Sequence, residues 1–418
     1  IHIGSSPSLT NVIFSGNSGG RGGGMSSFDA SPTLTDVTFN NNTSTNLGGG
    51  MYNTNGGIPT LNNVTFSGNT ATNTGGGMRN AISNPALTNV AYRANPAPIG
   101  GGTANLVSHP TLTNVTFSGN TAGGAIKNVS SNPIIRNSIL YGNTGGEIID
   151  SSSTPVVTYS IVQGGYAGAG NLDVNPLLSA LANNGGFTKT MSLGASSPAM
   201  NAGNNATCAA TDQRGIARPQ GTKCDIGAFE TEMLSLTLRS LGAQDGWTLE
   251  SGENTTVGGT MDSAATTFRL GDFTGDKQYR AILHFNTAGL PDNAVITKVT
   301  LKIRKQGQSG SDPFTILGGL TVDMRSPSFG TAALALGDFQ MLAGRSAVAT
   351  FGAAPVNSWY SAILNGQGRN YLNKVGATQF RLYFATDDND NGIADYMMFI
   401  SGDHTTVSAR PTLVIEYY

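Results

Sequence analysis

The chain has 418 residues, of which only 11% are charged, against about 25% in typical soluble domains, and its formal net charge is −2. Because it contains no long basic or acidic run, it offers no electrostatic footprint for nucleic acid or an anionic membrane surface. It also lacks the run of about 18 apolar residues that crosses a bilayer, so no membrane span is predicted.

The first third of the chain is a repeat marked by proline. Pro recurs at positions 7, 32, 59, 85, 110, 133 and 155, so successive repeats take between 22 and 27 residues. Three apolar residues in each repeat are spaced three and then two apart, which predicts a corner followed by a strand with one buried face. The clearest sets are Leu9, Val12, Phe14, then Leu34, Val37, Phe39, then Leu61, Val64, Phe66, and Leu112, Val115, Phe117.

Asparagine and glycine mark the predicted bends. Asn and Asp tolerate a left-handed backbone, and they stand at the first corner, at Asn11, Asp36, Asn63, Asn89, Asn114 and Asn137. A second corner is predicted at Asn17, Asn42, Asn69, Asn95, Asn120 and Asn143. A glycine cluster then leads to one more inward position, at Met25, Met51, Met78 and Thr103. Residues 1–174 therefore predict a right-handed parallel β-helix of about seven coils, with apolar columns inside and ladders of Asn at its corners.

These repeats also carry a family resemblance. The pairing of Gly-Gly-Gly-Met with Phe-Ser-Gly-Asn resembles the repeats of polymorphic outer-membrane proteins and related bacterial surface β-helices. Tyr92 and Leu140 replace Phe in two of the tetrads. The resemblance implies a pectate-lyase-like fold and a cell-surface or secreted role, and it does not imply an enzyme.

Residues 175–232 break the repeat. Their ordered motifs, among them Asn-Asn-Gly-Gly-Phe from Asn183 and Cys-Asp-Ile-Gly-Ala-Phe-Glu from Cys224, resemble the choice-of-anchor Q region, which implies a segment that closes the β-helix. Four charged residues here could be mistaken for a catalytic cluster, but a buried ion-pair network sealing the last coil is the favoured interpretation. They are Asp212, Arg214, Arg218 and Asp225.

The two cysteines, Cys208 and Cys224, lie in this same polar segment without a nearby third ligand. That pattern favours a disulfide over a metal site, and a disulfide favours an extracellular location. Two free thiols remain the alternative.

Residues 233–418 lose the glycine repeat and alternate apolar with polar side chains, as in Val299, Leu301 and Ile303 with Thr300 and Lys302 between them. Several such runs separated by turn residues predict an antiparallel β-sandwich. The runs Tyr-Arg-Ala-Ile-Leu-His-Phe from Tyr279 and Arg-Pro-Thr-Leu-Val-Ile-Glu-Tyr from Arg410 resemble DNRLRE-type domains. The resemblance implies a jelly-roll-like module that binds glycan or serves as a structural appendage.

One loop of the sandwich matches the calcium-loop pattern. Asp387, Asn389, Asn391 and Asp395 fill positions 1, 3, 5 and 9, and Gly392 takes the sixth place, where such a loop turns sharply. Ile393 would offer its carbonyl at the seventh. Met398 stands at the twelfth position, which usually holds a bidentate Glu. The pattern predicts a weak calcium site or one that recruits another carboxylate, and an acidic hairpin turn is the alternative.

Three aromatic residues, Trp247, Trp359 and Tyr360, could form a stacking platform for a sugar. Core packing is the favoured interpretation, since a sandwich needs large residues inside.

An enzyme is not predicted, because charged residues in the coils are scattered and the four histidines show no metal-ligand spacing. Ile1, His2 and Ile3 run directly into the first repeat, so the open end of the β-helix is predicted to contact another copy head to tail. A first coil cut from a longer β-helix is the alternative. We therefore expect an extracellular structural protein of a cell surface or filament. A glycan-binding adhesin is the second expectation, and a polysaccharide lyase is less favoured.

Overall fold

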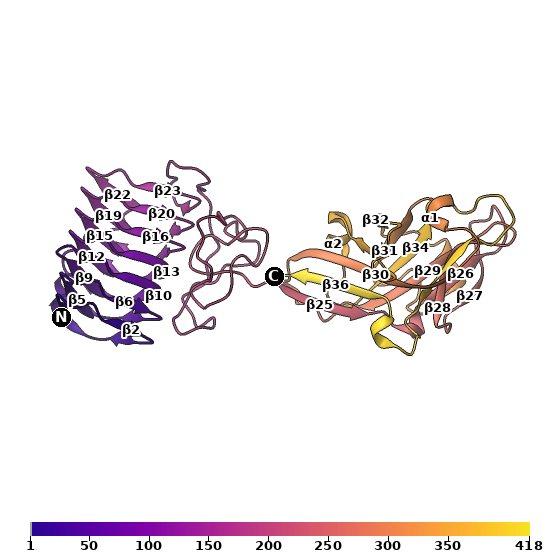
Figure 1. The fold of residues 1–418 in the computed structure, drawn as a ribbon, viewed down its shortest axis with the longest axis horizontal. Coiled ribbons are helices and arrows are strands. Elements are labelled where there is room, and N and C mark those ends of the chain that lie inside the picture. Colours follow the sequence, from indigo (N-terminus) through magenta and orange to yellow (C-terminus); the bar gives the residue numbers. More distant parts are fainter. Residues whose placement is uncertain (1) are drawn as a thin grey trace. The chain divides into compact units, whose positions relative to one another are not determined.

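The structure is a computed structural model that describes residues 2–418. It divides into two compact units, Ile1–Glu232 and Met233–Tyr418, and the boundary falls where the alternating pattern begins. The first unit is a solenoid of stacked parallel strands, and the second is a curled antiparallel sheet (Figure 1). The prediction of an all-β chain, with a β-helix followed by a sandwich, is confirmed.

Two long parallel sheets form the walls of the β-helix. The first is β1 (His2–Ile3), β5 (Met25–Phe28), β9 (Met51–Thr54), β12 (Met78–Ala81), β15 (Thr103–Leu106), β19 (Ile126–Val129) and β22 (Ile148–Ser151). The second begins each coil with β2 (Ser8–Thr10), β6 (Thr33–Thr35), β10 (Thr60–Ser67), β13 (Ala86–Arg93), β16 (Thr111–Thr113), β20 (Ile134–Arg136) and β23 (Val156–Thr158).

The second sheet continues past the first corner of each coil. There it contains β3 (Ile13–Ser15), β7 (Thr38–Asn40), β17 (Thr116–Ser118), β21 (Ile139–Tyr141) and β24 (Ile161–Val162). Two small sheets form a third side, namely β4 (Ser18–Arg21), β8 (Thr43–Leu47) and β11 (Thr70–Ala71), and β14 (Pro96–Ala97) with β18 (Thr121–Ala122). The described residues make about six turns rather than about seven, because the chain leaves the solenoid after β24 before it completes the last coil.

Identical positions of successive coils lie side by side. Leu34, Leu61, Leu87 and Leu112 are in register, as the repeated spacing requires. An aromatic column runs beside them, with ring centroids between 4.4 and 4.9 Å apart and planes within 7° of parallel. Its members are Phe14, Phe39, Phe66, Tyr92 and Phe117.

The two predicted bends differ in how Asn is used. At the first corner the predicted residues themselves take a positive φ, between 49° and 57° from Asn11 to Asn137. At the second corner the residue before each predicted Asn takes it, for example Gly68 at 66° and Ala94 at 53°. The predicted residues form an amide ladder instead, which is buried from Asn42 to Asn120. In it Asn69 Nδ2 donates to Asn95 Oδ1 at 3.0 Å and Asn95 Nδ2 donates to Asn120 Oδ1 at 2.8 Å.

The second unit contains twelve strands. They are β25 (Leu234–Arg239), β26 (Gly246–Glu250), β27 (Gly258–Asp262), β28 (Thr267–Phe273), β29 (Lys277–Asn286), β30 (Ile296–Ser309), β31 (Leu320–Arg325), β32 (Arg345–Phe351), β33 (Trp359–Ile363), β34 (Ala377–Phe384), β35 (Tyr396–Ile400) and β36 (Thr412–Tyr417). Two short helices, α1 (Pro313–Ile316) and α2 (Gly366–Tyr371), lie between strands.

The sheet of this unit encloses one large apolar core. Its main path runs β25-β36-β30-β35-β28-β29-β34-β31-β32, and all its pairs are antiparallel. Val299, Leu301 and Ile303 of β30 are buried in the core, while Lys302 is only half buried on the other face. Among residues 2–418 no helix is long and apolar enough to cross a membrane.

Candidate functional site

The segment after β24 lies beside the second sheet of the β-helix (Figure 1). Its contacts run from β10, where Thr65 Oγ1 donates to the carbonyl of Lys189 at 2.8 Å, to β24, where Ile161 packs in a cluster with Ile226 and Phe229. The segment therefore covers several coils along their side, and does more than seal the last one. Its chain forms isolated bridges but no strand between β24 and β25, so side chains of the coils help to fix its backbone.

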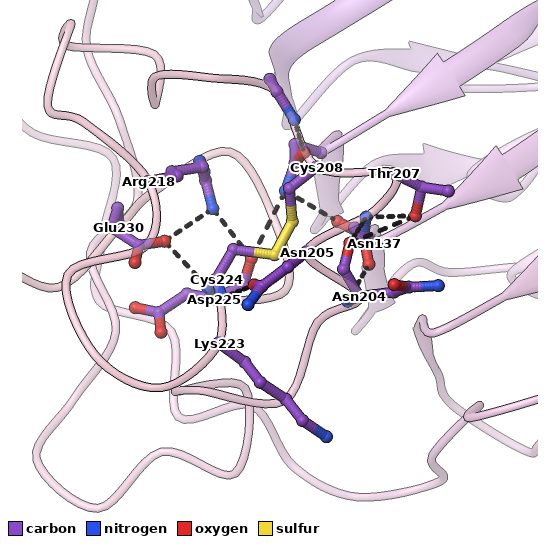
Figure 2. The surroundings of a disulfide bond; sticks show 12 residues. Asn137, Asn204, Asn205, Thr207, Cys208, Arg218, Lys223, Cys224, Asp225 and Glu230 are labelled. Atoms are coloured by element: carbon purple, nitrogen blue, oxygen red, sulfur yellow. Dashed lines mark hydrogen bonds and ion pairs between the residues drawn. A yellow bond between two sulfur atoms is a disulfide. The ribbon is translucent and has the colours of Figure 1, made fainter.

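Asparagines of the first corner supply that fixation. Asn137 Oδ1 accepts from the amide of Asn204 at 2.8 Å, and Asn137 Nδ2 donates to Thr207 Oγ1 at 3.0 Å (Figure 2). Asn114 Oδ1 accepts from the amide of Ala209 at 3.0 Å. The left-handed corner thus orients these amides outward, and they satisfy backbone groups of a loop that has few strand partners of its own.

Cys208 and Cys224 are joined in a disulfide, with their Cα atoms 6.7 Å apart. Figure 2 shows this bridge between the corner residue Asn137 and the charged residues Arg218 and Glu230. The disulfide joins two parts of the segment that are 16 residues apart in sequence, and Cys224 precedes Asp225 of the charged network.

The charged network is buried and well partnered. Arg214 lies 2.8 Å from Asp212, and Arg218 lies 2.9 Å from Glu230. Asp225 does not form an ion pair of this kind; its oxygens accept from the amides of Asn201 and Thr231, both at 2.7 Å. Burial raises the pKa of Glu230 to about 7, and the charge of Asp225 adds to the rise.

Such a network holds the segment together by satisfying buried groups. Asp212 accepts from the amides of Arg214, Ile216 and Glu230 at 2.8 to 3.0 Å. Carboxylates engaged by several backbone amides are fixed in place. The arrangement suits a structural role better than proton transfer, which needs a group that faces a reacting molecule.

A groove lies between the β-helix and this segment. Its cavity volume is about 490 Å³, and its floor is formed by outward side chains of β3, β7, β10 and β13. Arg93 and Lys189 make it cationic, and Phe187, 47% exposed, forms part of its wall. The remaining lining residues are Ile13, Thr38, Asn40, Thr65, Ser67 and Leu181.

A second groove of about 310 Å³ lies on the outer face of β25, β36, β30 and β33. Trp359 lines it and is half buried, with Lys302 and Arg239 beside it. Arg304, paired with Trp359 across the strands, carries a third positive charge. An indole beside several cations, together with Thr237 and Thr412 hydroxyls, is a surface that can hold a sugar ring and its acidic groups.

The other two predicted aromatics lie elsewhere. Tyr360, 3% exposed, points into the core and stacks on Phe314 at 5.3 Å. Trp247 on β26 packs against Tyr279 at 5.2 Å. The structure therefore does not bring the three rings together, and only Trp359 lines an open groove.

The predicted calcium loop follows β34 and ends at β35. Asn389 Nδ2 and Asn391 Nδ2 donate to Asp395 Oδ2 at 3.1 and 3.2 Å, so three of the predicted ligands converge. Asp387 and Ile393 are exposed. The backbone amide of Ile393 donates to Asn391 Oδ1 at 2.6 Å, whereas among the described residues no hydrogen bond joins the Asp387 side chain to that group. Within residues 2–418 there is no group of three His, Cys, Asp or Glu side chains placed to hold a metal.

The predicted assembly residues can be described only in part. Ile1 lies outside the described residues. His2 and Ile3 form β1, which pairs with β5 opposite Ser27 and Phe28. Their side chains are likewise outside the description, so head-to-tail contact stays a prediction.

Sequence reasoning missed two sets of polar residues in this unit. Gln213 Nε2 donates to Thr65 Oγ1 at 2.7 Å and to Thr188 Oγ1 at 2.9 Å, and so links the segment to β10. A second amide ladder fills the coil two residues after each inward Met, Thr or Ile; that spacing was a signal available in the sequence. It runs through Asn53, Asn80, Asn105, Asn128 and Asp150 at 2.8 to 2.9 Å.

Comparison with known proteins adds no family: no protein-family model and no curated protein matches this chain.

Proposed function

We propose that this chain is an extracellular structural protein, in which the β-helix is a rigid spacer that carries the sandwich. The observation behind the proposal is the continuity of its internal columns. Stacked rings 4.4 to 4.9 Å apart link five successive coils, from Phe14 to Phe117. An amide ladder links six, from Asn17 to Asn143. Bending the solenoid between two coils would open several of these contacts at once, and buried amides left unpaired are costly.

Three further features support a location outside the cell. The Cys208–Cys224 disulfide is a type of bond that persists in oxidising compartments. The repeats resemble those of bacterial surface β-helices, and the two later segments resemble modules of secreted proteins.

The proposal is tested by locating the protein and measuring its stiffness. Antibodies against residues 1–232 should bind to the surface of intact source cells or detect the protein in the culture medium. Single-molecule pulling should show the β-helix unfolding only at forces well above those needed to straighten a flexible linker. Label confined to permeabilised cells, or a unit that extends without resistance, would contradict it.

A glycan-binding adhesin is the second candidate, and the groove around Trp359 favours it. Among the described residues, neither Lys302 nor Arg304 takes part in an ion pair, and Lys298 pairs instead with Glu416 at 2.9 Å. Unpaired cations beside a half-buried indole fit an acidic polysaccharide, such as one built from uronic acids.

A glycan array tests this candidate with the full chain. Binding should favour acidic polysaccharides, weaken with salt, and fall at least ten-fold in Trp359→Ala. Ile363→Ala removes another exposed apolar side chain of the same strand and should leave binding unchanged. If neither variant changes binding, the sugar is held elsewhere.

Self-association and a lyase activity are the remaining possibilities. Analytical ultracentrifugation of the full chain tests the first. For the second, the cationic groove with Arg93 and Lys189 is the place to examine: release of unsaturated sugar ends that disappears in Arg93→Ala would make the chain an enzyme.

A further inference from the structure

The loop that matches the calcium pattern lies next to a carboxylate that the sequence did not indicate. Asp272, the penultimate residue of β28, is fully buried at 0% exposure. Its Oδ1 accepts from the amide of Asp395 at 3.0 Å, so the carboxylate lies against the last residue of the loop. Its Oδ2 is buried and has no hydrogen-bond partner.

An unpartnered buried carboxylate oxygen is costly unless a donor or a cation reaches it. The pairing of β28 with β35 places the Asp272 carboxylate beside the loop. Gly271 is paired with Tyr396, and Asp272 exchanges backbone hydrogen bonds with Asp395 at 3.0 and 3.1 Å. A side chain at Gly271 would place its Cβ 2.3 Å from the carbonyl oxygen of Asp395. The close approach of these two strands therefore requires glycine.

The loop itself contributes the other oxygen atoms near Asp272. Asp395 is 2% exposed, and its Oδ1 accepts from the amide of Ser311. Its Oδ2 accepts hydrogen bonds from the side-chain amides of Asn389 and Asn391. Asn389 Oδ1 accepts from the amide of Asn391 at 3.2 Å, and Asn391 Oδ1 accepts from the amide of Ile393 at 2.6 Å. Turning either side-chain amide would give up that hydrogen bond and place its oxygen beside Asp395, so a bound cation has to replace the lost bond.

We propose that Asp272 and Asp395, with the amide oxygens of Asn389 and Asn391, bind one calcium ion. Asp272 takes the part that the missing twelfth-position Glu plays in the calcium-loop pattern. The donor set contains only oxygen atoms, comes from a partly exposed loop and a buried strand end, and mixes carboxylates with neutral amides. Calcium accepts six to eight such ligands in irregular geometry, whereas Mg²⁺ requires a near-ideal octahedron.

The inference is independent of the proposed function, because it concerns how the sandwich is held together at one end. The loop joins β34 to β35, and β28 lies next to β35 in the sheet. A bound cation would therefore fix the loop to a neighbouring strand. Because it binds the folded state, calcium should raise the melting temperature of this unit.

Calorimetric titration of CaCl₂ into the full chain, first stripped with a chelator, tests the site. One ion should bind per chain, and Asp272→Asn should weaken binding at least ten-fold. This variant keeps an oxygen able to accept from the Asp395 amide and removes one negative charge. Terbium provides a second readout, since its luminescence should be sensitised by Tyr396 next to the loop.

Asp390→Asn is the matched control. Asp390 lies in the same loop, is exposed, and carries the same charge, but it is not among the proposed ligands. Its affinity for calcium should stay within two-fold of the parent chain. Equal losses of calcium affinity in Asp272→Asn and Asp390→Asn would mean that calcium is attracted only by the overall charge of the loop, and would overturn the proposal. The proposal would also be overturned if calcium addition gave no heat of binding and terbium gave no sensitised luminescence.

A further variant guards against misfolding of Asp272→Asn. Asn391→Ala removes an exposed side chain that hydrogen-bonds within the loop. It should lower the calcium-free melting temperature only slightly while it weakens calcium binding at least three-fold. Unchanged affinity in this variant, together with unchanged affinity in a folded Asp272→Asn, would contradict the assigned ligands.

Discussion

Asp245 is a carboxyl group fully enclosed in the second unit, next to the short turn that precedes β26. Its Oδ1 accepts from the amide of His284 at 2.7 Å. Burial raises the pKa of Asp245 to about 8, and the nearby charge of Asp403 adds to the rise. The folded chain therefore binds this proton more tightly than the unfolded chain does.

The stability of this unit should for that reason depend on pH. An acid with a raised folded pKa contributes its full stability below the unfolded value of about 4. That contribution is lost as the pH rises toward the folded value. Urea unfolding of the second unit should give a lower free energy at pH 8 than at pH 5, and Asp245→Asn should flatten this slope.

The exposed residue Asp292 provides the comparison, because Asp292→Asn should keep the slope of the parent chain. If Asp245→Asn retains the parent slope as well, another group controls the pH dependence.

At this scale the sequence predicts residues whose role is set by their neighbours along the chain. The left-handed corners at Asn63 and Asn114 are of this kind, since backbone preference is local. Asp272 and Gln213 are not, because their partners lie 123 and 148 residues away along the chain. Only the folded structure brings such pairs together.

Among the elements, the aromatic column makes the β-helix coils interdependent. Phe66 on β10 lies between Phe39 at 4.8 Å and Tyr92 at 4.7 Å and is fully buried. Each ring between the ends of the column thus has two stacked neighbours from adjacent coils.

Replacing Phe66 with Ala should destabilise the first unit by about 3–5 kcal/mol, the usual range for removing a buried ring. Chemical denaturation followed by circular dichroism measures the change. Ile82→Ala, at a side chain 57% exposed on the same solenoid, should cost less than about 0.5 kcal/mol. Similar losses in the two variants would mean that the column does not carry this stability.

The strands of the β-helix could be predicted because each coil repeats one apolar spacing, and the parallel register of the Leu column follows from it. The bounds of the segment 175–232 could be predicted from the sequence, but its position relative to the coils could not. Its position beside the coils depends on outward amides such as Asn137 and on Thr65. Both residue types are also common where nothing docks.

Considered as a whole, the molecule consists of two units with separate cores. The only disulfide among the described residues lies in the first, and it closes a loop of 16 residues. In the chain-entropy description, a loop of about 15 residues contributes about 3 kcal/mol.

Replacing both Cys208 and Cys224 with Ser should therefore lower the melting temperature of the first unit and leave the second unchanged. Differential scanning calorimetry would resolve this as one shifted and one unshifted transition. A single transition that moves as a whole would show instead that the two units unfold together.

The continuous columns have a consequence for how such a chain changes in evolution. Coils of 22 to 27 residues present corresponding inward positions at the same register. Duplication or loss of one repeat in the gene would thus join matching surfaces, and would change the length of the solenoid by one strand spacing, about 4.8 Å. Reach can therefore be adjusted in whole coils without a new core having to arise.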